Sequence, residues 1–282
     1  MLAPRHLIFT ALEGALIGPR TDSFAGAEEA VYELDRRKIA YILLTSRTRE
    51  EIEPARRKLE HNHPFVTENG GGIFFPDGYF SVRIPGVTRV ARYLSVAQGL
   101  PYAEVCEALD DIAEECAVGV AGFHHMSVRE IAENTGMKPR NAELARAREF
   151  DEPFYFTSAD DKAIARFVET ARTRGYDVRR GATFWHFSAK CDPARAVRTI
   201  AGLFRESTRT KLRLVGIGAR EQDLAWLSAV NQAIMLPASS DVPDGSDRPQ
   251  KTAGRAGTAV TMGEAPGPAG WNAAILNIIG PS

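Results

Sequence analysis

Four polar stretches of the sequence lie where short apolar runs end. Their candidate reactive side chains are Glu13, Thr45, Lys190 and Asp223. A hydroxyl or an ammonium group can hold an anion, and a carboxylate can attack an electrophile, move a proton or bind a metal ion. Each also has a simpler interpretation. Thr45 can end a strand with a hydroxyl hydrogen bond, and Asp223 can cap a helix that begins at Leu224.

Alternating strands and helices are expected to position these side chains. Apolar runs at 6–10 and 40–44 predict buried strands, and the amphipathic segment 25–38 predicts a helix between them. A helix at about 49–61 completes a βαβα pattern, which predicts a parallel sheet. Ligands of such sheets bind at the carboxyl ends of strands, so the first two polar stretches are expected to share a site.

The same pattern returns after residue 190. It predicts helices at 193–205, 224–230 and 270–279 and strands at 212–217 and 233–236. Segment 239–258 is rich in Ser, Asp, Pro and Gly, which predicts a mobile or irregular loop.

The middle of the chain differs, because helices and strands there do not continue the βαβα pattern. Segments 87–115, 127–149 and 159–174 are predicted to be helical, and the strands are expected at 118–123, 154–157, 176–180 and 184–187. This change of pattern predicts a separate α/β unit inserted into the parallel-sheet fold. The expected division is a core of residues 1–84 and 188–282 and an inserted cap of residues 85–187.

Composition favours a small-molecule partner over a polymer. There are 35 Lys and Arg residues against 36 Asp and Glu, a formal charge of -1, so no global field attracts nucleic acid or an anionic membrane. No apolar run reaches the length of a membrane helix. Three cysteines without metal-type spacing favour neither a disulfide framework nor a zinc site, and a reducing, cytoplasmic location is expected.

The order and spacing of the four polar stretches resemble the signature motifs of the haloacid dehalogenase superfamily. Those motifs are a strand ending in Asp-x-Asp-Gly-Thr, a Thr or Ser, a Lys, and Gly-Asp-x-x-x-Asp. Further stretches are similar to the mannosyl-3-phosphoglycerate phosphatase family: Glu68-Asn69-Gly70-Gly71-Gly72, Met126-Ser127-Val128, Arg148-Glu149-Phe150-Asp151-Glu152 and Gly267-Pro268-x-Gly270-Trp271-Asn272. The resemblance covers nearly the whole chain. It implies a Rossmann-like parallel-sheet core with an inserted α/β cap.

The resemblance also implies a reaction whose groups this chain lacks. The family uses a carboxylate nucleophile, a second carboxylate as acid and base, and Mg²⁺. Ala11 stands at the nucleophile position, Glu13 at the acid-base position, and Ala219 at a metal-binding position. A methyl group cannot attack phosphorus, and Glu13 is one methylene longer than Asp. Of the family's metal-binding residues in the fourth motif, only Asp223 remains, as a vestigial ligand.

Part of the binding set is retained. Thr45 matches the second motif, while the third-motif lysine aligns with Pro193 and Lys190 lies three residues earlier. The resemblance implies ligand contacts for Glu68, Asn69, Gly70, Gly71 and Arg148. The alternatives are a tight turn that needs positive φ values and an arginine that interacts with a helix dipole.

His124 and His125 suggest a metal site, and the family usually has Asp at position 125. Adjacent residues of a strand point to opposite faces, so a strand here predicts that the two rings do not share one ion. Trp185 and Trp271 are expected to pack in the interior.

Three hypotheses follow. The first is a pseudophosphatase that binds a small anionic ligand, a sugar phosphate or phosphoglycerate-type acid, and requires no cofactor or holds Mg²⁺ weakly. The second is a Mg²⁺-dependent sugar-phosphate phosphatase that uses Glu13, Thr45 and Lys190 in a rearranged site. The third is a non-catalytic subunit that binds a protein partner through the cap. The sequence does not identify such a partner.

Overall fold

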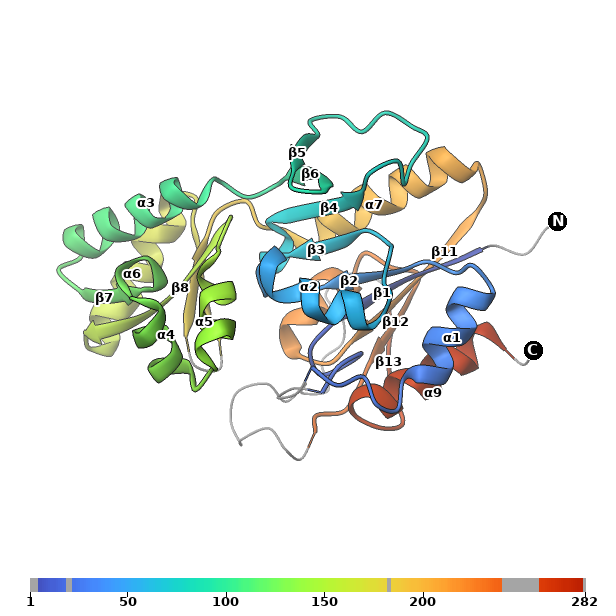
Figure 1. Cartoon of the computed structure of the whole chain (residues 1–282). Coiled ribbons are helices and arrows are strands. Elements are labelled where there is room, and N and C mark those ends of the chain that lie inside the picture. Colours follow the sequence, from blue (N-terminus) through green and yellow to red (C-terminus); the bar gives the residue numbers. More distant parts are fainter. Residues whose placement is uncertain (1–4, 19–21, 182–183, 240–258, 281–282) are drawn as a thin grey trace.

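The computed structural model describes residues 5–18, 22–181, 184–239 and 259–280. Two lobes lie side by side, each built on its own β-sheet (Figure 1). The α/β fold class with a mostly parallel central sheet is confirmed. Apart from Ser239, the segment predicted as an irregular loop lies outside the described residues. No helix in the described part of the chain has the length and apolar character of a membrane span.

The larger lobe contains a nine-stranded sheet with the order β13-β12-β11-β1-β2-β3-β4-β6-β5. The strands from β13 to β3 pair in parallel, and β4, β6 and β5 are antiparallel additions at one edge. Their bounds are β1 (Arg5–Ala11), β2 (Tyr41–Leu44), β3 (Phe65–Thr67), β4 (Gly72–Pro76), β5 (Thr88–Val90), β6 (Tyr93–Ala97), β11 (Leu212–Gly218), β12 (Gln232–Met235) and β13 (Val260–Met262).

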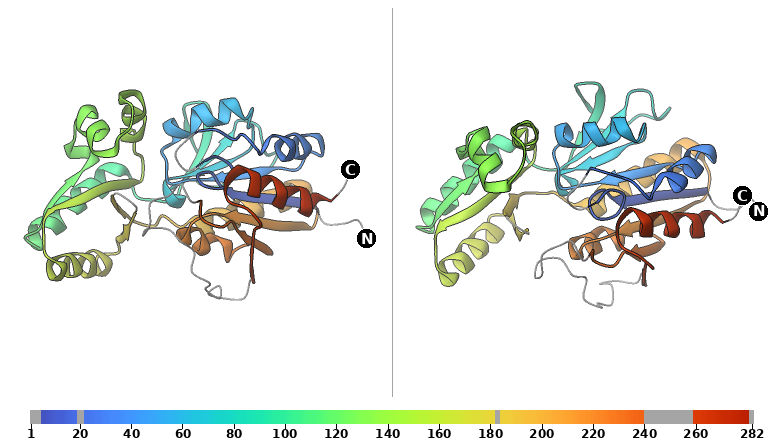
Figure 2. Two further views of the ribbon diagram at one scale, coloured as in Figure 1. Left: turned by 90° about the horizontal axis from the view of Figure 1, so that it is seen from below. Right: turned by 60° about the horizontal axis from the view of Figure 1, so that its bottom comes forward.

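Helices cover both faces of this sheet. The blue helices α1 (Glu28–Arg36) and α2 (Arg49–Lys58) lie on one face, and the orange helices α7 (Pro193–Thr208) and α8 (Leu224–Leu227) lie on the other (Figure 2). The central strands are therefore buried on both sides, which is why β2 is apolar throughout rather than alternating. Thr48 is the N-cap of helix α2 and forms a capping box with Glu51.

Trp271 and Asn272 of the C-terminal motif pack and hydrogen-bond the last helix against the rest of the larger lobe. Helix α9 (Gly267–Ile279) lies beside α1 (Figure 1). Trp271 is fully buried, as expected, and its Nε1 donates to Thr10 Oγ1 at 2.9 Å. Asn272 Oδ1 accepts from the backbone N–H of Ala30 at 2.8 Å. This motif therefore supports the strand that carries the first polar stretch.

The smaller lobe contains a four-stranded antiparallel sheet with the order β7-β8-β10-β9. Its strands are β7 (Gly119–Gly122), β8 (Asp151–Ser158), β9 (Asp177–Arg180) and β10 (Trp185–Ser188). Its helices are α3 (Tyr102–Glu115), α4 (Val128–Thr135), α5 (Pro139–Arg146) and α6 (Asp161–Thr173). Phe154, Phe167 and Phe187 form the core between the sheet and the helices α3 and α6.

The single helix predicted at 87–115 is wrong over its first part. Strands β5 and β6 occupy 88–97 and pair with the large sheet. Tyr93 and Ser95 are buried while Leu94 and Val96 are less so, the period-two pattern of a strand. We therefore propose that the cap begins after Ala97 rather than at Pro85. The helix predicted at 127–149 is also wrong, because left-handed Gly136 ends α4 before α5 begins.

The strand predicted at 118–123 ends one residue early, and this changes the meaning of the two histidines that follow. His124 and His125 lie in a short 3-10 helix, η2 (Phe123–His125). Their ring centroids are 3.7 Å apart. The prediction that the two rings point to opposite faces is therefore wrong, because a helical turn replaces the extended backbone that it assumed.

A half-buried histidine in the larger lobe is expected to make the fold sensitive to acid. His63 Nδ1 contacts the Tyr79 hydroxyl at 2.8 Å, and burial followed by the charge of Arg56 lowers its pKa to about 4. The unfolded chain binds the proton near pH 6.5, so between pH 6.5 and 4 it binds more protons than the folded chain. The free energy of unfolding should fall by roughly 3 kcal/mol over that range.

Urea unfolding at several pH values measures this effect. His63→Phe keeps an aromatic ring at this position and should flatten the pH dependence. His61, which is buried and has a lowered pKa, should leave a residual slope. Equal slopes for the variant and the unmodified protein would show that His63 is not the cause.

Candidate functional site

A small cavity lies where the carboxyl ends of β1, β2 and β11 meet the smaller lobe. Its volume is about 50 Å³. Arg179 of β9 reaches it from the smaller lobe, and the other lining residues belong to the larger lobe. The lining comprises Ala11, Glu13, Leu44, Thr45, Ser46, Val66, Asn69, Gly70, Arg179, Pro193, Arg220, Gln222, Asp223, Ala225 and Trp226. Three of the four polar stretches thus come together as the parallel sheet predicts.

Glu13 is held by two partners from the second polar stretch. The Thr45 hydroxyl contacts its carboxylate oxygens at 2.8 and 3.0 Å, and Arg47 Nε lies 2.8 Å from Oε1. Arg47 also pairs with Asp22 at 2.7 Å. Burial acts to lower the pKa of Arg47, but the carboxylates of Glu13 and Asp22 raise it above its ordinary value. The charged Arg47 thus neutralises Glu13, a contact that sequence reasoning missed.

Asp223 is buried and bound to its own loop. Its Oδ2 accepts from the backbone N–H groups of Ala219 at 2.8 Å and Arg220 at 2.9 Å, and its Oδ1 accepts from Trp226 Nε1 at 3.1 Å. Burial raises its pKa, and these donors act in the opposite direction. The predicted cap of the helix at Leu224 is wrong, since the side chain bonds to the preceding loop and makes no cap bond to α8.

The residues around the cavity do not fit a magnesium ion. Mg²⁺ needs oxygen ligands in near-octahedral geometry. Ala11 lines the cavity with a methyl group, Ala219 offers no side-chain oxygen, and the oxygens of Glu13 and Asp223 accept bonds from protein donors. The two loops lie close together, since a Cβ atom built on Gly14 would be 3.2 Å from Ala219 Cβ. A carboxylate is therefore missing on each side of the place where the first and fourth motifs meet.

Lys190 does not line the cavity. Its side chain is exposed and has no partner among the described residues. Pro193, which aligns with the family's lysine, lines the cavity instead. The cations at the cavity are Arg179 and Arg220, and Arg179 Nη2 donates to the Cys191 carbonyl at 3.0 Å. Arg179 lies on a strand with other charged residues, so its sequence pattern does not distinguish it.

The residues of the Gly-rich turn, 68–72, have two different environments. Asn69 and Gly70 line the cavity, whereas Glu68 and Gly71 do not, and the ligand contacts expected of all four stay a prediction. Gly70 has φ of +96°, and a Cβ atom there would lie 2.4 Å from the nitrogen of Pro193. Only glycine therefore permits this turn to contact the beginning of α7.

Glu68 and Arg148 connect the lobes rather than face the cavity. Glu68 is fully buried and accepts from the backbone N–H groups of Glu149, Phe150 and Asp151 at 2.8–3.0 Å. Arg148 Nε donates to the Asp151 carbonyl at 2.9 Å, and its Nη atoms contact the Ser46 carbonyl at 3.3 and 3.4 Å. The functional groups of both side chains therefore bind the protein itself, and the ligand contacts expected of them stay a prediction.

The electrostatics of this connection follow from burial and close charge. Burial raises the pKa of Glu68 to about 7, and Arg148 at 3.5 Å acts in the opposite direction. Burial likewise opposes ionisation of Asp151, but His186 at 2.9 Å and Arg148 at 2.5 Å lower its pKa below its ordinary range. Asn69 Nδ2 donates to Asp151 at 3.2 Å, so the connection extends to the cavity wall.

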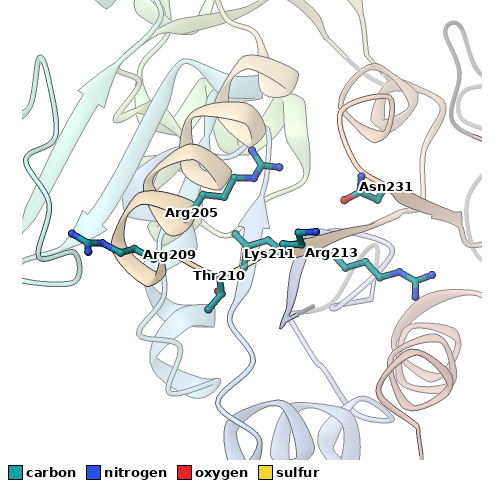
Figure 3. Close-up of a pocket in the computed structure, with 7 residues that line it drawn as sticks. Arg205, Arg209, Thr210, Lys211, Arg213 and Asn231 are labelled. Carbon is teal, nitrogen blue, oxygen red and sulfur yellow. The ribbon is translucent and has the colours of Figure 1, made fainter. Parts of the chain in front are cut away.

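A larger pocket of about 590 Å³ lies at the other edge of the sheet, where β11 begins and α7 ends. It is lined by Arg205, Arg209, Thr210, Lys211, Leu212, Arg213 and Asn231. Arg209 and Arg213 point in opposite directions (Figure 3). Its charges do not converge on one point, and it is remote from the carboxyl ends of the strands. The smaller cavity is therefore the better candidate site.

The parallel sheet, the second lobe and the position of the cavity define a haloacid dehalogenase-type fold with a cap. Solved structures support this class. A haloacid dehalogenase-like hydrolase from Bacteroides thetaiotaomicron matches with a TM-score of 0.62 at 15% identity over 97% of this chain and 99% of that chain. A subclass IIB sugar phosphatase of the superfamily matches with a TM-score of 0.56 at 12% identity over 84% and 89%.

Curated relatives identify the family. A glucosyl-3-phosphoglycerate/mannosyl-3-phosphoglycerate phosphatase of Methanococcoides burtonii is 33% identical over 98% of both chains. One of Persephonella marina is 30% identical over 97% of both, and a mannosyl-3-phosphoglycerate phosphatase of Pyrococcus furiosus is 27% identical over 82% of this chain and 90% of its own. The chain belongs to the mannosyl-3-phosphoglycerate phosphatase family. No protein-family model matches it.

Proposed function

We propose that this protein is a pseudophosphatase that binds a small phosphorylated or glycosylated acid between its lobes and does not hydrolyse it efficiently. The names of its relatives suggest glucosyl-3-phosphoglycerate or mannosyl-3-phosphoglycerate as the ligand class. The cavity at the carboxyl ends of the parallel strands supports this location.

The observation that carries the proposal is the combination of Ala11 with the Glu13–Arg47 ion pair. Ala11 supplies no nucleophile. Glu13 is the remaining carboxylate of the first motif, and it is bound to Arg47 Nε at 2.8 Å and to the Thr45 hydroxyl. A carboxylate neutralised by a guanidinium is a poor nucleophile and a poor base, because both roles need an available lone pair.

Anion binding without a metal is the second part of the proposal. Arg179, Arg220 and Asn69 bring positive charge and amide donors to the cavity. Replacement of two carboxylates by methyl groups also removes repulsion towards a phosphate. The present volume of about 50 Å³ is far below the roughly 300–1,000 Å³ that is typical of small-molecule sites. Ligand entry therefore requires the lobes to move apart.

Phosphate release and calorimetry test the two parts separately. With mannosyl- and glucosyl-3-phosphoglycerate, we expect no phosphate release above background with or without Mg²⁺, but heat of binding that persists in EDTA. Arg179→Gln should weaken binding at least tenfold. Lys190→Gln is the matched control and should bind like the unmodified protein, because Lys190 lies outside the cavity.

Two results would contradict the proposal. Efficient Mg²⁺-dependent hydrolysis would remove the pseudophosphatase interpretation and favour a rearranged catalytic site. If neither compound binds, with Mg²⁺ or in EDTA, the proposed ligand class is wrong. The cavity would then be a remnant of the family's active site without a binding role.

A further inference from the structure

A second cluster of reactive side chains lies within the smaller lobe. Cys106 and Asp110 come from one face of α3, His124 and His125 from η2, and Glu152 from β8. None of these five residues lines the cavity described above. The cluster is therefore independent of the proposed phosphate-ligand site.

One carboxylate and two imidazoles converge in this cluster. Asp110 Oδ2 lies 3.1 Å from His124 Nε2, and Asp110 Oδ1 lies 3.3 Å from His125 Nε2. One ligand atom from each of the three residues falls within 4.8 Å of the others. The side chains of Asp110 and His125 are 45% and 40% exposed, so the place where they meet is open to solvent.

A buried carboxylate fixes one of the two imidazoles. His124 Nδ1 lies 2.6 Å from Glu152 Oε1, and Glu152 is fully buried. The same oxygen accepts the backbone N–H of His124 at 3.0 Å, and the other accepts the Tyr102 hydroxyl at 2.6 Å. A carboxylate that holds the Nδ1 proton leaves the Nε2 lone pair for a metal, the arrangement found behind many metal-bound histidines.

The backbone is shaped to permit this contact. A Cβ atom on Gly122 would lie 2.2 Å from Glu152 Oε1 and 2.9 Å from His124 Nδ1. Any side chain at this position would therefore separate the buried carboxylate from the imidazole.

We propose that the cap binds a divalent transition-metal ion of the zinc class through His124, His125 and Asp110. The ligand atoms are Nε2 of both histidines and a carboxylate oxygen, with water at the remaining positions. Imidazole and carboxylate together suit Zn²⁺ or Co²⁺, whereas Mg²⁺ prefers oxygen ligands alone. Metal binding displaces the proton now shared between His124 Nε2 and Asp110. When His125 Nε2 binds the metal, the ring proton of His125 moves to Nδ1. Nδ1 can then no longer accept the hydrogen bond that the Gly122 amide now donates at 3.3 Å.

Cys106 offers a competing arrangement, because its thiol also groups with His124 and Glu152. Glu152 is fully buried and its two oxygens already accept three bonds. His124 Nε2 faces Asp110 instead, whose side chain is 45% exposed. The Asp110 grouping is therefore the one that an ion from solution can enter.

Calorimetric titration of the full chain, first treated with a chelator, with ZnCl₂ tests the proposal. The unmodified protein should bind one equivalent. Asp110→Asn and His125→Ala should each bind Zn²⁺ at least tenfold more weakly. Glu152→Gln should lower the affinity for Zn²⁺ by about 10- to 100-fold. Asp111→Asn, on the same helix, and Cys106→Ser should bind like the unmodified protein.

Visible absorption of bound Co²⁺ gives a second readout of ligand identity, and far-UV circular dichroism confirms that each variant is folded. His125→Ala should change the Co²⁺ spectrum and Cys106→Ser should not. A stoichiometry well below one, or unchanged affinity in both Asp110→Asn and His125→Ala, would overturn the proposal. Loss of binding in Cys106→Ser with retention in Asp110→Asn would overturn it as well.

Discussion

The double substitution Ala11→Asp with Ala219→Asp is expected to confer Mg²⁺-dependent phosphate release that neither single substitution confers. Ala11→Asp supplies a nucleophile but no metal carboxylate in the fourth motif, and Ala219→Asp supplies the reverse. Catalytic groups that act as a unit are strongly non-additive, so each single variant should stay at background. Release should be measured with mannosyl-3-phosphoglycerate as a function of Mg²⁺ concentration.

The Glu13–Arg47 pair limits how much activity the double variant recovers. Adding Glu13→Asp shortens the side chain and should weaken its hold on Arg47, freeing an acid and base. General acid–base catalysis contributes about 10²- to 10⁴-fold, so the triple variant should exceed the double variant by about 10²-fold or more.

The control for these substitutions is a variant in which the second carboxylate is added at another position of the cavity wall. Ala225 is exposed and lines the same cavity, so Ala11→Asp with Ala225→Asp adds the same charge in the wrong place and should remain inactive. Activity of the unmodified chain that Glu13→Gln abolishes would instead show that Glu13 is already catalytic.

Arg148→Met is expected to lower the free energy of unfolding by about 3–5 kcal/mol, the usual cost of removing one partner of a buried ion pair. The substitution leaves the buried carboxylates of Asp151 and Glu68 without their guanidinium. Its effect should be measured by urea unfolding at pH 7. Arg129→Met removes an ion pair whose arginine is 86% exposed, and it should change stability by less than about 1 kcal/mol.

Compensation tests the cause of this loss. In Arg148→Met with Asp151→Asn, one of the two buried charges is also removed, so part of the lost stability should return. If the double variant is no more stable than the sum of the two single effects predicts, lost packing rather than unpaired charge explains the result.

The parts of the fold that the sequence predicts are those with strong local patterns. The mostly apolar runs of β1, β2 and β11, together with the helices predicted between them, favour parallel strands buried on both faces, and the polar residues that follow them are then expected at one edge of the sheet. Strands β5 and β13 are short and partly exposed, so no local pattern marks them.

The candidate site was predicted less completely, because its decisive contacts join distant residues. The sequence itself shows an alanine, Ala11, at the family's nucleophile position. The pairing of Glu13 with Arg47, in contrast, depends on two loops that meet only in the folded chain. Arg148 illustrates the same limit. A helix-end arginine is usually exposed, and its burial arises only because β8 brings Asp151 and Glu68 to it.

The three bonds to Glu68 also affect hydrogen exchange. The amides of Glu149, Phe150 and Asp151 donate to a carboxylate of the other lobe rather than to a strand partner. Their protons can exchange with solvent when the lobes separate locally, without unfolding of either sheet. Exchange at these three consecutive amides thus records how often the two lobes separate.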